Sequence, residues 1–245
     1  MKIIGVIPAR YASSRFPGKP LADICGMPMI WWVYQQALKA VGIDSVIVAT
    51  DHLDIYTVCQ HLGLNVIMTA EKHKSGVERL SEVASVLDAD YYFLIQGDEP
   101  LIESDLVSEL SELIQQNKEN DSVVTFRTPI ESPVDVVNST IIKVITDVDN
   151  NMIFASRSAI PYPQNSVDFL YFKTVGIYSY PRSVALSYSN LRNSYLEKAE
   201  DHDLIRLLVN RINVKSYERK TDTISVDTPK DLRRIRDIIN KKMED

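Results

Sequence analysis

Short apolar runs rich in valine and isoleucine recur along the first half of this chain and alternate with segments whose apolar residues have helical spacing. The runs cover residues 3–7, 45–49, 65–68, 91–95 and 122–126. Runs of this kind are typical of strands buried on both faces. Their alternation with helices predicts right-handed crossovers and a mostly parallel sheet covered on both sides. Ligands of such sheets bind at the carboxyl ends of the strands, so the residues that follow each run are the first functional candidates.

The second half has a different pattern, with strands predicted at 141–146, 175–180 and 214–218 and polar loops between them. A helix is predicted over 196–209. Thr228 is a suitable N-cap for a last helix that has Pro229 at its first position. No repeat or convincing linker interrupts the chain, so we predict one α/β domain over residues 1–245, with a mixed, mostly parallel central sheet.

Composition favours a small-molecule partner. The 245 residues carry a formal net charge of −6, which argues against a nucleic-acid-binding surface. Cys25 and Cys59 have no metal-binding or redox spacing, and the four histidines share no spacing that would indicate a metal site. The N-terminal apolar run is too short for a signal peptide, and no apolar run has membrane-spanning length, so we expect a cytoplasmic protein.

The loop after the first strand is rich in cations. Arg10, Arg15 and Lys19 lie there with two serines, Ser13 and Ser14. Fixed positive charge and backbone N–H groups at the end of a buried strand predict a phosphate site, although a solvated surface cluster is the alternative. The loop lacks both G-x-x-x-x-G-K-[ST] and G-x-G-x-x-G, which excludes a Walker loop and a dinucleotide fingerprint.

Two acidic residues follow apolar segments. Asp98 comes directly after the run 91–95, in Gln-Gly-Asp-Glu-Pro, and Asp227 precedes the last predicted helix. A Mg²⁺ ion on substrate phosphates takes one or two protein carboxylates, so these residues could hold one together. The alternatives are a turn at Asp98 and a favourable acidic helix entrance at Asp227.

Ser75 and Glu78 have the spacing of a capping box, which is sufficient to explain both. Arg79, one residue further on, could pair locally or reach a nucleotide base.

Six segments resemble the CMP-KDO synthetase (3-deoxy-manno-octulosonate cytidylyltransferase) family, in order and over nearly the whole chain. They are residues 8–21, 26–30, 49–51, 75–79, 96–100 and 226–229. The resemblance implies a Rossmann-like nucleotidyltransferase fold of the nucleotide-diphospho-sugar transferase type. It also implies a homodimer that joins CTP to a 3-deoxy sugar acid with Mg²⁺, releasing pyrophosphate for lipopolysaccharide or capsule synthesis. Residues 1–130 would mainly bind CTP, and residues 131–245 would mainly bind the sugar and form the dimer.

The resemblance also implies residue roles. Arg10 and Lys19 would hold the triphosphate, and Asp98 and Asp227 would hold magnesium; these four are the catalytic candidates. The predicted CTP site comprises Pro8, Ala9, Arg10, Ser13, Lys19, Ser75, Arg79, Gln96 and Asp98, with the Pro8-Ala9 backbone and Arg79 toward cytosine. The predicted sugar site comprises Gln96, Arg157, Tyr178 and Asp203, with Arg157 on the sugar carboxylate.

Four positions depart from the family pattern: Thr174 stands for His, Asp203 for Glu, Leu204 for Gln and Val77 for Thr. Three of these lie on the predicted sugar side. We therefore expect either 3-deoxy-manno-octulosonate (KDO) or a modified acceptor, such as an amino-substituted KDO, another 2-keto-3-deoxy acid or a phosphonate. A non-catalytic CTP-binding protein is a further alternative, against which the retained Lys19, Asp98 and Asp227 argue.

Overall fold

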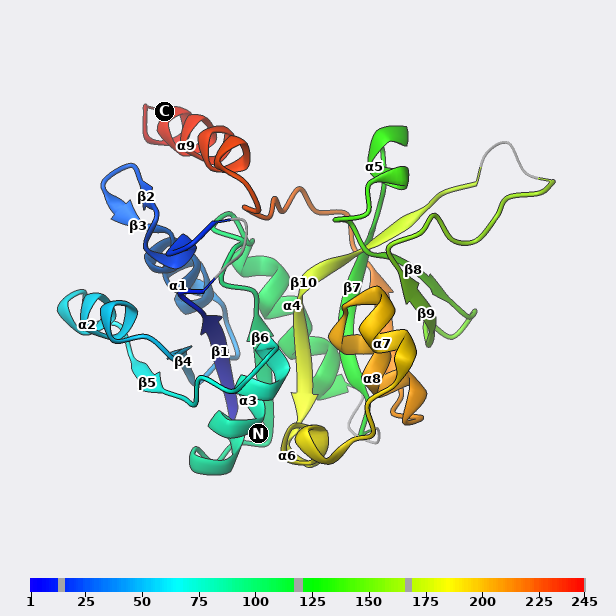
Figure 1. Ribbon diagram of the computed structural model, residues 1–245, viewed down its shortest axis with the longest axis horizontal. Helices are drawn as coiled ribbons and strands as arrows, with labels where there is room; N and C mark the ends of the chain where they lie inside the picture. Colours follow the sequence, from blue (N-terminus) through cyan, green and yellow to red (C-terminus); the bar gives the residue numbers. More distant parts are fainter. Residues whose placement is uncertain (13–15, 117–120, 166–168, 245) are drawn as a thin grey trace.

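The protein is built around one mixed sheet that runs through both halves of the chain (Figure 1). The computed structural model describes residues 1–12, 16–116, 121–165 and 169–244. Within these residues the main path of the sheet has the order β11-β7-β10-β6-β1-β4-β5, and β8 and β9 extend it from β10. Their bounds are β1 (Ile3–Ala9), β4 (Ser45–Thr50), β5 (Val66–Met68), β6 (Tyr91–Ile95), β7 (Val123–Pro129), β8 (Lys143–Thr146), β9 (Met152–Ser156), β10 (Phe172–Pro181) and β11 (Val214–Glu218).

Most strands of this path are parallel. β1 pairs in parallel with β4 and β6, β4 with β5, and β7 with β11, whereas β10 is antiparallel to its neighbours β6 and β7. This confirms the predicted mixed, mostly parallel sheet.

Alternate residues of β1 enter two separate apolar layers, because successive side chains of a strand point to opposite faces. Ile3 and Ile7 pack with α1, α2 and α4, whereas Ile4 and Val6 pack with α3, α6 and α8. The helices are α1 (Met29–Lys39), α2 (Leu53–His61), α3 (Gly76–Val86), α4 (Ser104–Gln116), α5 (Pro133–Val137), α6 (Arg182–Ser187), α7 (Tyr195–Glu200), α8 (Asp203–Val209) and α9 (Pro229–Glu244), with short 3-10 turns η1 (Lys19–Leu21) and η2 (Tyr188–Asn190).

The helix predicted over 196–209 is wrong as a single element, because the structure divides it into α7 and α8. Asp201 takes a left-handed conformation, with φ 47°, and ends α7. His202 then caps α8, since its Nδ1 accepts from the backbone N–H of Leu204 at 3.4 Å. Residues 200–203 are polar and interrupt the apolar spacing, but no Gly or Pro marks a turn there.

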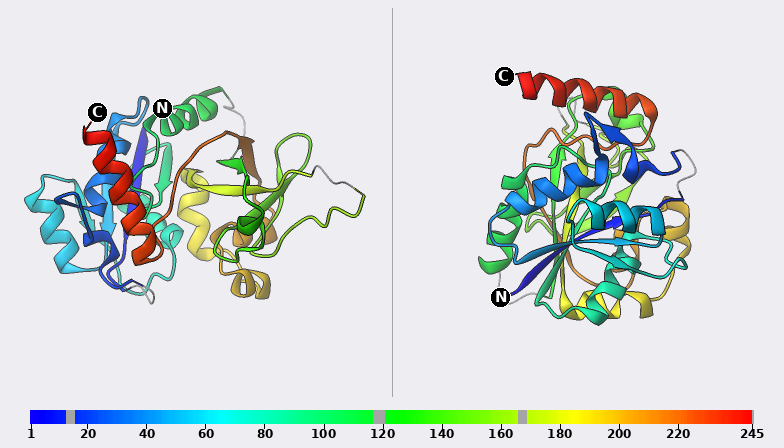
Figure 2. Two further views of the ribbon diagram at one scale, coloured as in Figure 1. Left: turned by 90° about the horizontal axis from the view of Figure 1, so that it is seen from above. Right: turned by 90° about the vertical axis from the view of Figure 1, so that its left-hand side faces the viewer.

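The last helix returns to the first half of the molecule. Residues 219–228, which we call the strap, cross from β11 to α9 without regular structure (Figures 1 and 2). α9 packs Leu232, Ile235 and Ile239 against the hairpin of β2 (Asp23–Ile24) and β3 (Met27–Pro28) and the start of α1. Thr228 Oγ1 accepts from Asp231 N at 3.4 Å, which confirms its predicted capping position.

Gly42, between α1 and β4, offers a test of how closely this connection packs against α4. It has φ 89°, and a Cβ there would lie 2.2 Å from Ser111 Oγ of α4. Gly63 also has a positive φ, 69°, but has nothing within 4 Å of a Cβ. We expect Gly63→Ala to lower the free energy of unfolding by about 1 kcal/mol through backbone strain, and Gly42→Ala by about 3 kcal/mol through strain and collision. Urea unfolding measures both free energies. Equal losses would contradict the close contact of Gly42 with α4.

Candidate active site

The carboxyl ends of β1 and β6 lie side by side because the two strands pair in parallel, with Val6 opposite Leu94. The backbones that follow them approach closely. A Cβ on Gly97 would lie 2.6 Å from the carbonyl oxygen of Pro8, so only glycine fits there without a shift. The loop after β1 and segment 96–100 therefore share one edge of the sheet.

Lys19, Asp98 and Asp227 converge at this edge. Lys19 Nζ lies 2.6 Å from Asp98 Oδ2 and 3.8 Å from Asp227 Oδ1, and all three side chains are partly buried. The strap reaches Asp98 through its backbone, since Val226 N donates to Asp98 O at 2.8 Å. Residues from three distant parts of the sequence thus form one cluster.

The donor set of this cluster fits Mg²⁺. The Lys19 ammonium already lies between the two carboxylates, which marks a place where a cation is favourable. The oxygens of Asp98 and Asp227 are hard ligands, and Mg²⁺ takes one or two of these in addition to phosphates and water. Among the described residues, no group of three or more His, Cys, Asp or Glu side chains could hold a metal, so such an ion would need substrate oxygens.

Glu99 is buried beside this cluster and was not assigned a role from sequence. Its carboxyl group lies against Gly176 of β10 and accepts a hydrogen bond from Ser225 Oγ at 3.2 Å. Burial, reinforced by the neighbouring Asp98 carboxylate, raises the pKa of Glu99 to about 7.

A pocket of about 930 Å³ lies between the two halves of the chain. It brings together five of the predicted site residues: Arg10, Ser75, Gln96, Tyr178 and Asp203. Its lining does not include Lys19, Asp98, Asp227 or Arg157. The structure thus groups the predicted residues into a pocket and an adjoining charge cluster, while Ser13 lies outside the described residues.

One side of the pocket is formed by the end of β1 and the start of α3. Arg10 is exposed and donates through Nη1 to the carbonyl oxygen of Lys74 at 2.8 Å. Ser75 caps α3, because its Oγ accepts from Glu78 N at 3.3 Å. The capping prediction is confirmed for Ser75, whereas the Glu78 carboxylate accepts from Lys74 N at 2.8 Å rather than from the capping residue.

Arg79 lies beneath this surface with no solvent exposure. Its Nη2 lies 2.6 Å from Asp51 Oδ2, and its Nη1 donates to Thr69 Oγ1. These two contacts are with the residues that directly follow β4 and β5. A role for Arg79 toward cytosine stays a prediction.

Arg157 is held by backbone carbonyls. It donates to Glu200 O at 2.7 Å, to Ser139 O at 2.9 Å and to Asp201 O at 3.0 Å. These bonds fix α7 to the loop after α5, and the predicted contact with a sugar carboxylate stays a prediction.

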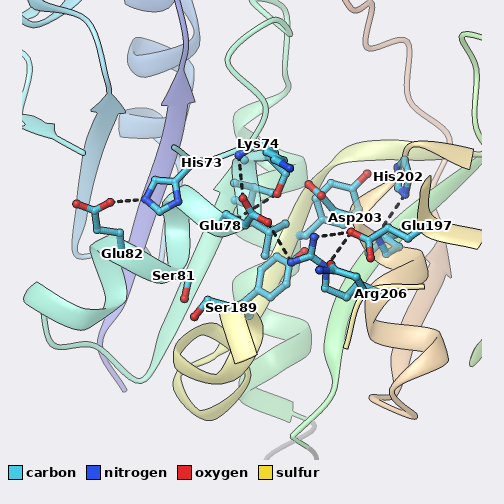
Figure 3. A pocket seen from close by; sticks show the side chains of 18 of the residues that line it. His73, Lys74, Glu78, Ser81, Glu82, Ser189, Glu197, His202, Asp203 and Arg206 are labelled. Carbon is cyan, nitrogen blue, oxygen red and sulfur yellow. Dashed lines mark hydrogen bonds and ion pairs between the residues drawn. The ribbon is translucent and has the colours of Figure 1, made fainter. Parts of the chain in front are cut away.

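A buried ion-pair network forms one wall of the pocket and was missed by sequence reasoning (Figure 3). Arg206 of α8 lies 3.1 Å from Glu78 of α3 and pairs with Glu197 of α7, and it stacks over Tyr188 with 4.7 Å to the ring centroid. Burial alone would lower the pKa of Arg206. The hydrogen bond with Glu197 is the largest of the effects that outweigh burial, so the pKa is raised. The network connects the two halves of the chain. Its only signal in the sequence was Glu78, which the capping box already explained.

The sequence matches the Cytidylyltransferase family over residues 4–220. A 3-deoxy-manno-octulosonate cytidylyltransferase of Solibacter usitatus is 40% identical over 96% of this chain and 93% of that protein. One from Escherichia coli is 39% identical over 99% of this chain and 98% of that protein. The solved structure of CMP:2-keto-3-deoxy-manno-octonic acid synthetase complexed with CTP superposes with a TM-score of 0.93 at 40% identity, covering 99% of this chain and all of that one. This chain belongs to the cytidylyltransferase family.

A more distant structural neighbour supports the nucleotidyltransferase fold. A putative glucose-1-phosphate thymidylyltransferase from Bacillus anthracis has a TM-score of 0.67 at 17% identity, over 96% of this chain and 94% of that one. The family and fold predicted from the sequence are confirmed. No helix among the described residues is long and apolar enough to cross a bilayer.

The structure shows what surrounds the four positions at which this cytidylyltransferase departs from the family pattern. Leu204 is 1% exposed; Leu204 and Val77 belong to one apolar layer, and both line the pocket. Asp203 lines the pocket, where burial raises its pKa to about 6 while a hydrogen bond with Ser75 opposes the shift. Thr174 hydrogen-bonds the Tyr178 side chain, whose pKa burial raises. An apolar side chain thus stands at Leu204, where the family pattern has an amide.

The buried pair of Arg79 and Asp51 makes a stability prediction. Asp51→Asn would leave a guanidinium in the interior without its counter-charge, so we expect a loss of roughly 3–5 kcal/mol in the free energy of unfolding. Asp88→Asn breaks the ion pair with Arg182 at the surface and is the matched control, expected to change stability little. Urea unfolding of the three proteins measures the difference. Equal, small effects would show that Arg79 finds another partner.

His202 makes a pH prediction. Burial and the nearby Arg157 guanidinium lower its pKa from 6.5 to about 4, so the unfolded chain takes up this proton at a higher pH than the folded one. As the pH falls from about 6.5 to about 4, this group alone removes about 3 kcal/mol from the free energy of unfolding. His202→Asn can still cap α8 and does not titrate. We expect its stability to fall less steeply than wild type over this range in urea unfolding; parallel profiles would contradict the prediction.

Proposed function

We propose that this protein transfers CMP from CTP to the anomeric hydroxyl of 3-deoxy-manno-octulosonate and releases pyrophosphate. The convergence of Lys19, Asp98 and Asp227 at the strand ends is the observation that carries this proposal. Relatives named 3-deoxy-manno-octulosonate cytidylyltransferase, 39–40% identical over nearly the whole chain, support the same reaction. So does the CTP-bound synthetase structure that superposes on the whole fold.

CTP binds the first half of the chain, residues 1–130. The Pro8-Ala9 backbone and Arg79 face cytosine, and Ser13, Ser75 and Gln96 complete the site. Arg10 and Lys19 hold the triphosphate as fixed cations at the end of β1.

Asp98 and Asp227 are the residues that would hold Mg²⁺ together with phosphate oxygens, and a bound ion would supply positive charge to the triphosphate. Lys19, which contacts both carboxylates, adds positive charge at the same place. The cluster therefore stabilises the charge that moves to the leaving group.

The sugar acid binds mainly the second half, residues 131–245, through Arg157, Tyr178 and Asp203, and Gln96 of the first half completes its contacts. Its anomeric oxygen attacks the α-phosphorus in line, the bond to the bridging oxygen of pyrophosphate breaks, and the hydroxyl proton leaves to solvent or a nearby base. The chain orients the two substrates and forms no covalent intermediate.

A modified acceptor is the second candidate, and Leu204 favours it. An alkyl side chain, 1% exposed in the apolar layer, replaces the amide that the family pattern has at this position. A polar sugar group that loses its partner costs roughly 1–3 kcal/mol. An amino-substituted KDO, another 2-keto-3-deoxy acid or a phosphonate would retain the same transfer chemistry.

A homodimer in the cytoplasm, serving lipopolysaccharide or capsule synthesis, completes the proposal. Large apolar side chains are exposed on α5 and on the described residues between β9 and β10. They include Val134, Val137, Tyr162, Phe169 and Leu170. Exposed apolar residues in one region are typical of a subunit interface.

Pyrophosphate release with CTP and Mg²⁺ tests the reaction across acidic acceptors. We expect KDO to be used, and Asp98→Asn to lower kcat by about 100-fold or more while the folded structure is kept, because a ligand of the metal is lost. Thermal unfolding and circular dichroism monitor the fold.

The acceptor series separates the two candidates. A clear preference for KDO over amino-substituted KDO, other 2-keto-3-deoxy acids and phosphonates would exclude the modified acceptor. No release with any acceptor would favour the CTP-binding protein without catalysis, and full activity in Asp98→Asn would remove Asp98 from the metal site.

A further inference from the structure

Glu99 is a buried acid with no part in the proposed transfer. It is 6% exposed, and among the described residues its Oε2 has no hydrogen-bond partner. Its other oxygen, Oε1, accepts from Ser225 Oγ at 3.2 Å. An acid buried with so few partners costs stability, which calls for a compensating role.

The carboxyl group of Glu99 lies in a space that Gly176 leaves open. A Cβ on Gly176 would lie 2.1 Å from Glu99 Oε1, so any other residue there would displace the carboxyl group. Gly176 belongs to β10, and its carbonyl oxygen accepts from Gln96 N at 2.9 Å. The Glu99 side chain is therefore held against the central sheet, next to the end of β6.

The strap meets segment 96–100 at two adjacent points. Val226 N donates to Asp98 O at 2.8 Å, and Ser225 Oγ donates to Glu99 Oε1. One hydrogen bond leaves a segment free to turn about it, whereas two neighbouring bonds fix its direction as well. Asp227 is the next residue along the strap, so its position depends on both contacts.

A third contact of the strap lies further from the acid pair. Thr221 Oγ1 donates to Glu103 Oε1 at 2.8 Å. This bond has the same chemistry as that of Ser225 with Glu99, a strap hydroxyl on a glutamate that follows β6. Thr221 is therefore a matched control for Ser225.

We propose that Glu99 is a positioning residue that, through Ser225, sets Asp227 against Asp98 so that the two carboxylates face one Mg²⁺ ion. This role rests on the proposed function, in which Asp98 and Asp227 hold the metal. Glu99 itself touches neither substrate nor metal. Residues that orient metal ligands typically contribute 10–100-fold to metal affinity or activity.

The test compares Ser225→Ala and Glu99→Ala with Thr221→Val. We expect the first two to raise the Mg²⁺ concentration for half-maximal rate by roughly tenfold and to lower kcat by roughly 10–100-fold. The KM for CTP should stay within about twofold, because the CTP contacts are intact. Thr221→Val should resemble wild type, and Glu99→Gln, whose amide oxygen can accept from Ser225, should recover most of the loss.

Metal binding gives a readout independent of turnover. Mn²⁺ affinity of the enzyme with CTP and no sugar acid, followed by electron paramagnetic resonance, should fall by roughly tenfold in Ser225→Ala and stay unchanged in Thr221→Val. Equal affinities in these two variants, together with equal Mg²⁺ requirements, would overturn the positioning role.

Asp227→Asn separates this inference from the proposed function. Loss of activity in Asp227→Asn with wild-type behaviour in Ser225→Ala would overturn the positioning role alone. Full activity in Asp227→Asn would overturn the metal role, and the positioning role with it.

Discussion

The parallel pairing of β1 with β6 is the constraint on which the rest of the structure depends. It places the loop carrying Arg10 and Lys19 beside the segment carrying Asp98, and the close approach of Gly97 to Pro8 keeps them together. Charges that meet at a partly buried sheet edge interact more strongly than they would in water. The juxtaposition of Lys19 and Asp98, on which the proposed triphosphate and metal site rests, therefore follows from the order of the strands.

The sheet edge supplies only part of this cluster, because Asp227 belongs to the strap. The apolar face of α9 packs on the β2–β3 hairpin, and Val226 is buried in the same cluster. Lys19 begins η1, which leads directly into this hairpin, so the packing of α9 brings the second carboxylate to the ammonium. Ordinary apolar burial at the end of the chain thus helps to assemble the charge cluster.

Features of the fold that depend on local sequence patterns could be predicted. Val- and Ile-rich runs gave the strands, and their alternation with helices gave the parallel sheet and its functional edge. The sequence alone did not decide whether Asp98 and Asp227 lie together. A turn also explained Asp98, and a helix entrance also explained Asp227. The corner at Asp201 and the network of Glu78, Arg206 and Glu197 were missed. The network depends on contacts between distant segments, and the corner carries no Gly or Pro that would mark it in the sequence.

The same network explains why donor and acceptor recognition can change separately. Arg206 fastens the α7–α8 wall to Glu78 of α3 through buried ion pairs, and removing one partner of such a pair costs far more than changing a neighbour. The wall therefore keeps its place on the CTP side while individual positions on it vary. Asp203 and Leu204 lie on that wall, whereas Lys19, Asp98 and Asp227 lie outside the pocket lining. Substitutions in α8 therefore change the pocket wall without touching the cluster of Lys19, Asp98 and Asp227.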